Sequence, residues 1–255
     1  MSVDRAAALE LQRRGLTAFV RMFAAGAERS ALFERNGVVA SIVPAVPERS
    51  VINSVVYRDA RSLGATLGDL TRAYEEAGVH AWTVWVPEAD RDAAALLEAA
   101  GHRLDASPTA MVLDLAGIGE PTRDGLDWDA TAAVEDVTRI NDLAYGFELG
   151  TFGGGLASRP PEMPLRLYQA RVEGRPACVM ATIDDRDDCG IYMVATVKQH
   201  RGRGLARRLL HRALSEARAR GLRTSSLQST SFGYPVYERL GYEPICALEM
   251  WERRE

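Results

Sequence analysis

The segment TVKQHRGRGLARRLLHRALSEARARG, residues 196–221, is the most informative part of this sequence. Two glycines, Gly202 and Gly204, stand among arginines near its start, and Gly221 closes it. The preceding residues 190–197, GIYMVATV, predict a strand, so the chain passes from a strand through a glycine loop into a helix. The first turn of a helix has unpaired N–H groups and a partial positive charge, which favour an anion. The apolar residues of this helix are spaced to fall along one face: Leu205, Leu209, Leu210, Ala213, Leu214 and Ala217.

The glycine loop does not match two familiar nucleotide-binding motifs. A P-loop requires a lysine and a serine or threonine after its last glycine, whereas Leu205 and Ala206 follow Gly204 here. A dinucleotide fingerprint requires a glycine at the position that Arg207 occupies. Glycines still allow positive φ angles and a close approach of a ligand to the backbone. The loop is therefore predicted to hold an anion in a different way.

The composition is that of a globular protein. Of the 255 residues, 47% are hydrophobic and 26% are charged, which argues against disorder and leaves room for one large or two small domains. The net charge of −4 argues against a nucleic-acid partner. No apolar run is long enough to span a membrane, and the N-terminus lacks the apolar core of a signal peptide. We therefore expect a cytoplasmic protein with no membrane partner.

The three cysteines predict buried thiols and no metal site. Cys178, Cys189 and Cys246 lack the CxxC or Cys/His spacing of zinc ligands. Unpaired thiols are typical of a reducing compartment, which agrees with the expected cytoplasmic location.

The chain contains two similar successions of predicted helices and strands. Residues 116–125, AGIGEPTRDG, predict a linker between them. The first succession has predicted helices at 4–25, 67–78 and 90–101, and predicted strands at 37–46, 50–58, 80–86 and 108–115. The second has predicted helices at 130–146, after Gly204 and at 234–241, and predicted strands at 165–172, 176–184, 190–197, 223–230 and 245–252.

A short internal match supports a tandem duplication. The segments LLEAAGH, residues 96–102, and VYERLGY, residues 236–242, can be overlaid so that two glutamates and two glycines coincide. Each segment follows a strand that itself follows a longer helix ending in glycine. We therefore predict two units, 1–115 and 126–255, joined by the linker 116–125. The predicted fold class is α/β (α+β), in which each unit is a mixed, mostly antiparallel twisted sheet flanked by helices.

The motif R-x-x-G-x-A stands between the predicted strand and the long helix. It comprises Arg201, Gly202, Arg203, Gly204, Leu205 and Ala206. With this motif, and with the closing segment GYPVYERLGYE at 233–243, the chain resembles the GNAT superfamily of acyl-CoA-dependent N-acyltransferases, whose signature is [QR]-x-x-G-x-[GA]. The resemblance covers residues 125–255 well and residues 37–115 in outline. It implies two tandem GNAT-like units.

The resemblance implies acetyl-CoA as the acyl donor and places it residue by residue. Its diphosphate would lie on the backbone N–H groups from Gly202 to Arg207. Its pantetheine arm would pair with the backbone of a strand, like an added strand. Thr230 stands where many relatives have an asparagine that contacts CoA. The strand residues implied for the pantetheine arm are Val194, Ala195 and Thr196.

The resemblance also implies the chemistry, in which a primary amine attacks the thioester directly. Tyr237 matches the tyrosine that protonates the departing CoA thiolate, and its alternative is an aromatic residue of the core. Position 225 is a serine where some relatives have a glutamate base, so no base is carried over. By chemistry alone, a carboxylate or a water relay remains open as the base; the carboxylates are Glu148, Asp184 and Asp188. His200 in the loop is assigned to the neighbourhood of the phosphates, and His211 to the flank of the helix.

The N-terminal half lacks these features. Residues 57–70, YRDARSLGATLGDL, contain no R-x-x-G-x-[GA] match, and Leu97 overlays Tyr237. We therefore predict a degenerate N-terminal copy. The predicted function is N-acetyl transfer to an amine of a small molecule or peptide, with residues 146–164 as a flap over the acceptor. Alternatives are a tandem acetyltransferase resembling mycothiol synthase and a non-catalytic acyl-CoA sensor or interaction module.

Overall fold

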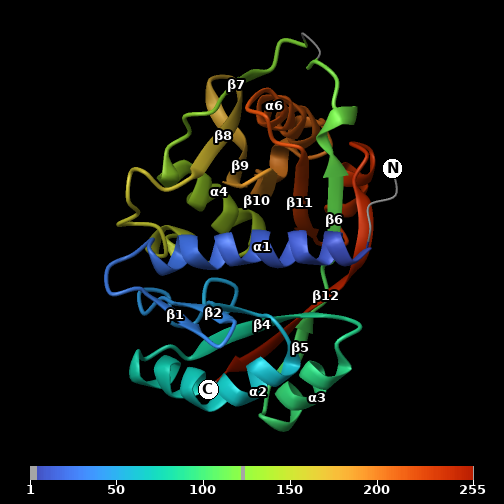
Figure 1. The fold of residues 1–255 in the computed structure, drawn as a ribbon. Coiled ribbons are helices and arrows are strands. Elements are labelled where there is room, and N and C mark those ends of the chain that lie inside the picture. Colours follow the sequence, from blue (N-terminus) through green and yellow to red (C-terminus); the bar gives the residue numbers. More distant parts are fainter. Residues whose placement is uncertain (1–4, 122–123, 255) are drawn as a thin grey trace. The chain divides into compact units, whose positions relative to one another are not determined.

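The computed structural model of the chain describes residues 5–121 and 124–254 and contains two compact units (Figure 1). Unit 1 comprises the described residues up to Gly15, Met111–Gly153 and Pro164–Ile245. Unit 2 comprises Leu16–Ala110, Gly154–Met163 and Cys246–Glu255, of which residue 255 is not described. Four elements contribute residues to both units: α1 (Arg5–Ala24), α5 (Thr151–Gly154), β6 (Thr109–Asp114) and β12 (Glu243–Arg254).

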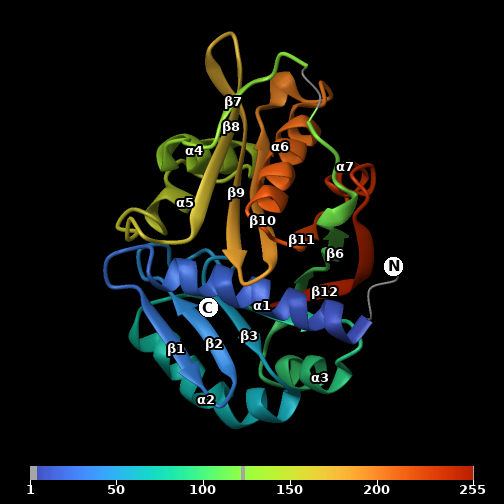
Figure 2. The same cartoon turned by 45° about the horizontal axis from the view of Figure 1, so that its top comes forward.

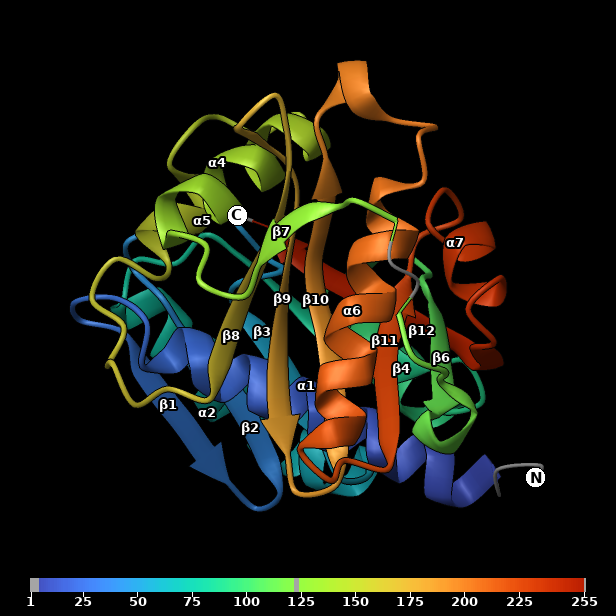
Figure 3. The ribbon, with the colours of Figure 1, turned by 90° about the horizontal axis from the view of Figure 1, so that it is seen from above.

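Unit 1 is built on a sheet with the strand order β6-β11-β10-β9-β8-β7 (Figure 2). Its pairs are antiparallel from β7 to β10, whereas β10 and β11 are parallel. Figure 3 shows α6 along one face of this sheet, with α4 behind it. The strands are β7 (Asp127–Asp129), β8 (Leu165–Val172), β9 (Arg175–Asp185), β10 (Asp188–Thr196) and β11 (Thr224–Ser229). The helices are α4 (Val134–Tyr145), α5 (Thr151–Gly154), α6 (Leu205–Ala219) and α7 (Tyr234–Glu238), with single 3₁₀ turns η1 (Leu115–Gly117) and η2 (Lys198–His200).

The apolar stripe of α6 forms the centre of the unit 1 core. All six residues predicted for it are buried, and they pack with residues of β8, β9 and β10 in one cluster. Burial of this stripe sets the orientation of the helix, so its other face, which carries arginines and a histidine, is left toward solvent. The N-terminus of α6 is thereby held at the end of β10.

Unit 2 has the strand order β1-β2-β3-β4-β12, with β5 also paired to β12. The pair β3/β4 is parallel and the pairs β1/β2, β2/β3 and β4/β12 are antiparallel. The strands are β1 (Ala31–Arg35), β2 (Val38–Ile42), β3 (Ser54–Tyr57), β4 (Ala81–Pro87) and β5 (Arg103–Ala106). The helices are α2 (Ala60–Glu76) and α3 (Arg91–Ala99).

Each sheet includes a strand from the other half of the sequence. β12, at the end of the chain, pairs with β4 in unit 2, with Trp251 opposite Val84. β6, from the first half, is the neighbour of β11 in unit 1. The compact units therefore differ from the contiguous units 1–115 and 126–255 expected from the sequence. Strand pairing joins residues far apart along the chain, and hydrophobic periodicity does not specify which partner a strand takes.

The predicted duplication is visible in two pairs of helix ends. Gly101 and Gly241 have left-handed φ angles of 87° and 93°. The N–H of the following residue bonds back to the equivalent carbonyl, from His102 to Leu97 at 2.9 Å and from Tyr242 to Tyr237 at 3.1 Å. Gly78 and Gly221 close α2 and α6 with the same pattern. This is the Schellman arrangement, in which only glycine adopts the left-handed turn without strain.

Several elements depart from the sequence expectation. β1, β5 and β7 were not predicted, and β1 is largely exposed, so it shows no alternation of apolar and polar residues. α2 begins at Ala60, seven residues before the predicted start, because Asp59 caps it. A Cβ atom at Gly64 would stand 3.4 Å from the Leu96 side chain, so the glycine leaves room for Leu96 of α3. Two glycines in its first half lower helix propensity and concealed this start.

Cys178, Cys189 and Cys246 are buried, as predicted, and none of them forms a disulfide in the described structure. Across residues 5–121 and 124–254, no helix combines the length and the apolar character that crossing a bilayer requires.

Candidate functional site

β10 and β11 separate along their length. Their parallel pairing comprises Asp188 with Thr224, Cys189 with Ser225 and Gly190 with Ser226, and within the described residues it ends there. β9 continues to pair with β10 as far as Thr196. The later part of β10 therefore has a strand partner on one side only. Its other side is an open strand edge to which an extended, amide-containing arm can bind.

A β-bulge bends β10 where the edge opens. The register with β9 shifts between Tyr192 and Ala195, and Met193 has a φ angle of 54°, an unusual value for a residue with a side chain. Asn141 of α4 donates from Nδ2 to the Met193 carbonyl at 2.9 Å, which secures this conformation. Its Oδ1 atom is buried and has no hydrogen-bond partner in the described structure. The bulge re-aims the backbone of Val194 and Ala195, two residues predicted to contact the cofactor.

The glycine loop after β10 leaves the start of α6 uncapped. Gly202 and Gly204 have φ angles of 75° and 72°, as the motif predicts, and nothing lies within 4 Å of the place that a Cβ atom would take at either residue. Gly204 is the N-cap residue, and no side chain bonds to the first turn. The N–H groups of Leu205, Ala206 and Arg207 are therefore left for an acceptor from outside the helix.

The equivalent helix of unit 2 has a different start. The Asp59 side chain accepts a hydrogen bond from the Ser62 N–H at 2.7 Å and so caps α2. Hydrogen bonds from Arg58 and Ser62 lower the pKa of Asp59 to about 2, so the carboxylate is charged at neutral pH. A negative charge that belongs to the chain thus occupies the position that α6 leaves open.

Arg201, the first residue of the motif, binds the protein backbone. Its guanidinium donates to the Thr196 carbonyl at 3.0 Å and to the Ala144 carbonyl at 3.3 Å. It also lies 5.8 Å from the centroid of the Phe232 ring. Arg201 therefore ties the end of β10 to the end of α4, a role that the motif alone did not predict. By contrast, the Arg203 side chain is exposed and has no polar partner among the described residues.

Tyr237 combines a packed ring with an unpaired hydroxyl. Its ring packs edge-on against Tyr242, with centroids 5.7 Å apart, and both belong to the core of unit 1. Among the described residues its hydroxyl has no hydrogen-bond partner, whereas the Tyr242 hydroxyl bonds to Ser225 Oγ at 2.7 Å. Burial, followed by the proximity of Tyr145 and Cys178, raises the pKa of Tyr237 well above its ordinary value. Tyr237 is therefore a protonated phenol with a hydrogen available to donate.

Thr230 serves as a cap in this structure. Its hydroxyl accepts a hydrogen bond from the Gly233 N–H at 3.2 Å, and its carbonyl accepts one from the Tyr234 N–H at 3.0 Å. These bonds shape the turn that leads into α7 and so position Tyr237. The Thr230 hydroxyl retains its own hydrogen for donation to a ligand.

An aromatic cluster beside Arg201 was not predicted from the sequence. Tyr145 stacks on Phe147 at 6.0 Å between centroids, and Phe147 packs against Phe152 at the same distance. Tyr145 is 50% exposed and Phe232 is 78% exposed, unusual values for such large rings. The only signal in the sequence was the presence of aromatic residues in and next to two predicted loops. Exposed rings at this position form an apolar surface that is open to solvent.

The two aspartates proposed as bases do not reach this site. Asp184 forms two bonds of 2.9 Å with Arg220. Asp188 is the first residue of β10, so about 25 Å of strand separates it from Thr196 at the other end. Glu148 is exposed on the segment after α4. His200 lies in the turn before the loop with its Nδ1 atom buried and unpaired in the described structure, and His211 faces a pocket on α6.

The buried carboxyl group of Asp188 should make the stability of the protein depend on pH. Burial raises its pKa to about 6 although Ser226 and Thr224 donate hydrogen bonds to it. The folded state therefore binds more protons than the unfolded state between about pH 4 and 6, and stability falls as pH rises through this interval. We expect Asp188→Asn to remove this loss, which is about 3 kcal/mol for a shift of this size. Urea unfolding of both proteins from pH 4 to 7 measures it.

The exposed Asp105 provides the control for that titration. Asp105→Asn should leave the pH dependence of the free energy of unfolding unchanged, because this carboxylate lies at the surface. Curves for Asp188→Asn and the wild type that stay parallel across the interval would show that Asp188 is ionised at its ordinary pKa.

The fold and the site define an α/β protein with an open strand edge, an uncapped helix start and a buried phenol. Residues 188–245, which include β10, α6, β11 and α7, match the family model "Acetyltransferase (GNAT) domain". The whole chain is similar in structure to a GCN5-related N-acetyltransferase from Kribbella flavida, with a TM-score of 0.69, 17% identity, and 96% and 95% of the two chains covered.

Two further solved structures agree in architecture. A tandem GNAT protein from the clavulanic acid biosynthesis pathway, solved without acetyl-CoA, has a TM-score of 0.61 and 17% identity, with 94% of this chain and 87% of that chain covered. A GCN5-related N-acetyltransferase from Sphaerobacter thermophilus has a TM-score of 0.55 and 17% identity, with 93% and 91% covered. The predicted resemblance is confirmed: the chain has the tandem GNAT fold, and its second half contains the GNAT acetyltransferase domain pattern.

Proposed function

We propose that this protein transfers an acetyl group from acetyl-CoA to a primary amine of a small molecule or peptide. One observation carries the proposal: the open edge of β10 leads to the uncapped start of α6, and Tyr237 has an unpaired hydroxyl. A diphosphate at the helix start and an amide-bearing arm along the strand are the two parts of CoA that such an arrangement accommodates.

The cofactor contacts of this proposal come mainly from the backbone. The N–H groups from Gly202 to Arg207 hold the diphosphate, and the exposed side chain of Arg203 adds positive charge. Val194, Ala195 and Thr196 pair with the pantetheine arm. The bulge at Met193 is the support for this step, because it turns the backbone of the following residues away from the regular ladder.

The reaction follows from these positions. The amine nitrogen attacks the thioester carbonyl, and a backbone N–H at the opened edge of β10 stabilises the oxyanion. The intermediate collapses with cleavage of the C–S bond, and the hydroxyl of Tyr237 gives its proton to the CoA sulfur. The proton lost by the amine leaves through water or Glu148, since the placement of Asp184 and Asp188 argues against either as the base. That proton restores the phenol through solvent.

The test of the proposal is release of the CoA thiol in the presence of a panel of primary amines. Thiol release that depends on the amine supports the enzyme, with a mass increase of one acetyl group on the accepted amine as the second readout. Tight binding of acetyl-CoA without turnover on any amine would favour the sensor and would contradict the proposal.

We expect titration calorimetry to give one CoA per chain. The start of α2 already holds the Asp59 carboxylate, which repels a diphosphate, and Leu97 occupies the position equivalent to Tyr237. Leu97 is fully buried and offers no proton. Inorganic pyrophosphate is the control ligand, since it should compete with CoA for the same single site. A stoichiometry of two would contradict the degenerate copy.

A further inference from the structure

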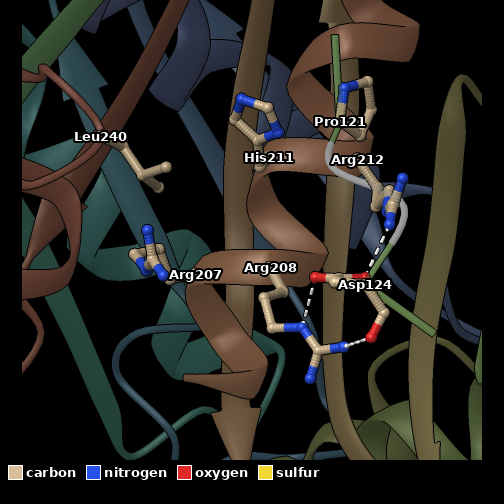
Figure 4. A pocket seen from close by; sticks show the side chains of 7 residues that line it. All are labelled: Pro121, Asp124, Arg207, Arg208, His211, Arg212 and Leu240. Atoms are coloured by element: carbon tan, nitrogen blue, oxygen red, sulfur yellow. Dashed lines mark hydrogen bonds and ion pairs between the residues drawn. The ribbon is translucent and has the colours of Figure 1, made fainter. Parts of the chain in front are cut away.

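A basic pocket lies on the exposed face of α6 in unit 1, beyond the glycine loop (Figure 4). Its volume is about 430 Å³. Four basic side chains of the helix line it, together with Pro121, Asp124 and Leu240. The proposed reaction makes no use of these side chains, so their accumulation in one pocket requires its own explanation.

Asp124 neutralises two of the four basic groups. Its carboxylate accepts hydrogen bonds from Arg208 Nε at 2.5 Å and from Arg212 at 2.8 Å. Arg208 also donates to the Asp124 backbone carbonyl at 2.9 Å. These bonds hold the segment before β7 against the helix, so the two arginines have a structural role that accounts for them.

Arg207 and His211 form the other half of the pocket. In the described structure neither side chain has an ion pair or a hydrogen bond. They are four residues apart on α6 and so share one side of the helix. Figure 4 shows them on the side of the pocket toward Leu240, away from the ion pairs of Asp124. Burial and then the nearby charges of Arg212 and Arg207 lower the pKa of His211, and Asp124 and Glu120 oppose this shift only in part.

Arg207 and His211 lie close to the N-terminus of α6. Arg207 is the third residue of α6, and His211 lies about one turn further along. CoA carries a phosphate monoester on the 3′-oxygen of the ribose whose 5′-oxygen bears the diphosphate. A diphosphate at the N-terminus of α6 therefore places a second anion within reach of the first two turns of this helix.

We propose that Arg207 and His211 bind the 3′-phosphate of CoA. The proposal rests on the proposed function, because it requires the diphosphate at the start of α6. A guanidinium is suited to a phosphate monoester, since it offers planar pairs of N–H donors to two oxygens. Leu240 supplies an apolar surface on the same side, against which the adenine or ribose can pack. Two unpaired basic groups match one phosphate and are too few for a nucleic-acid backbone.

The test compares CoA with 3′-dephospho-CoA by titration calorimetry. The wild-type protein should bind CoA more tightly, by about tenfold, the effect expected for one hydrogen-bonded charge pair. Arg207→Gln should remove that preference by weakening CoA binding about tenfold, while its affinity for 3′-dephospho-CoA stays at the wild-type value. Arg175→Gln, at the exposed β8–β9 turn, changes the net charge equally and should preserve the preference.

The outcomes separate the pocket from the proposed function. If Arg207→Gln lowers the affinity for CoA and for 3′-dephospho-CoA equally, the arginine contacts the diphosphate. That result would overturn the assignment of the pocket to the 3′-phosphate and leave the proposed function standing. Absence of binding of both ligands to the wild-type protein would overturn both. As a second readout, the NMR titration of His211 should shift to higher pH with CoA and much less with 3′-dephospho-CoA. The charged groups that face His211 are Arg207, Arg212, Asp124 and Glu120.

Discussion

Tyr237→Phe is expected to lower the rate of acetyl transfer about 10²–10⁴-fold, which is the contribution typical of a positioned acid. The substitution removes the proton that the departing CoA sulfur needs. It leaves the ring in place, and the ring makes the packing contact with Tyr242. Because the hydroxyl has no hydrogen-bond partner in the described structure, the free energy of unfolding should change little. The affinity for acetyl-CoA should also be retained.

Tyr242→Phe is the matched control for this experiment. It removes the same atom from the neighbouring ring, where the hydroxyl is bonded to Ser225 at 2.7 Å. We expect this variant to lose about 1 kcal/mol of stability, the usual contribution of one hydrogen bond, and to keep its turnover. The substitution of Tyr242 should thus change the stability, and the substitution of Tyr237 should change the rate of acetyl transfer. Near-normal turnover in Tyr237→Phe would contradict the acid assignment and leave Tyr237 as a packing residue.

Gly204→Asp is expected to abolish the rise in melting temperature that acetyl-CoA produces. The new carboxylate would stand at the N-cap of α6, where Asp59 stands in α2, and would repel the diphosphate. Two charges about 4 Å apart near a protein surface interact by about 4 kcal/mol, so affinity should fall at least about 100-fold. Thermal shift and titration calorimetry both measure this loss.

Gly204→Asn separates charge from backbone strain. Asparagine has almost the size and shape of aspartate, it tolerates the left-handed conformation, and it is neutral. Both variants alter a position with a φ angle of 72° and free space for a side chain, so their folding costs should be similar. We expect Gly204→Asn to retain most of its affinity for acetyl-CoA. Equal loss in the two variants would show that the glycine is required for its conformation, and equal retention would exclude the loop as the diphosphate site.

The features that could be predicted from the sequence depend on residues close together along the chain. The buried stripe of α6 follows from a spacing of 3.6 residues, and the positive φ angles of Gly202 and Gly204 follow from a motif of six residues. The repeated helix ends at Gly101 and Gly241 are likewise local, since one turn of chain makes the whole hydrogen-bond pattern. These features sufficed to predict the GNAT resemblance and the duplication.

The features that could not be predicted depend on residues far apart in the sequence that pack together in the fold. β6 and β12 each join the sheet of the other half, which no periodicity indicates. Arg201 and Arg207 look alike in the sequence, yet the first is bound to the carbonyls of Thr196 and Ala144 and the second lacks a polar partner in the described structure. Local pattern sets backbone conformation and which face is buried. Which polar groups remain available to a ligand is settled only when distant segments pack, because that packing decides which donors and acceptors are already used.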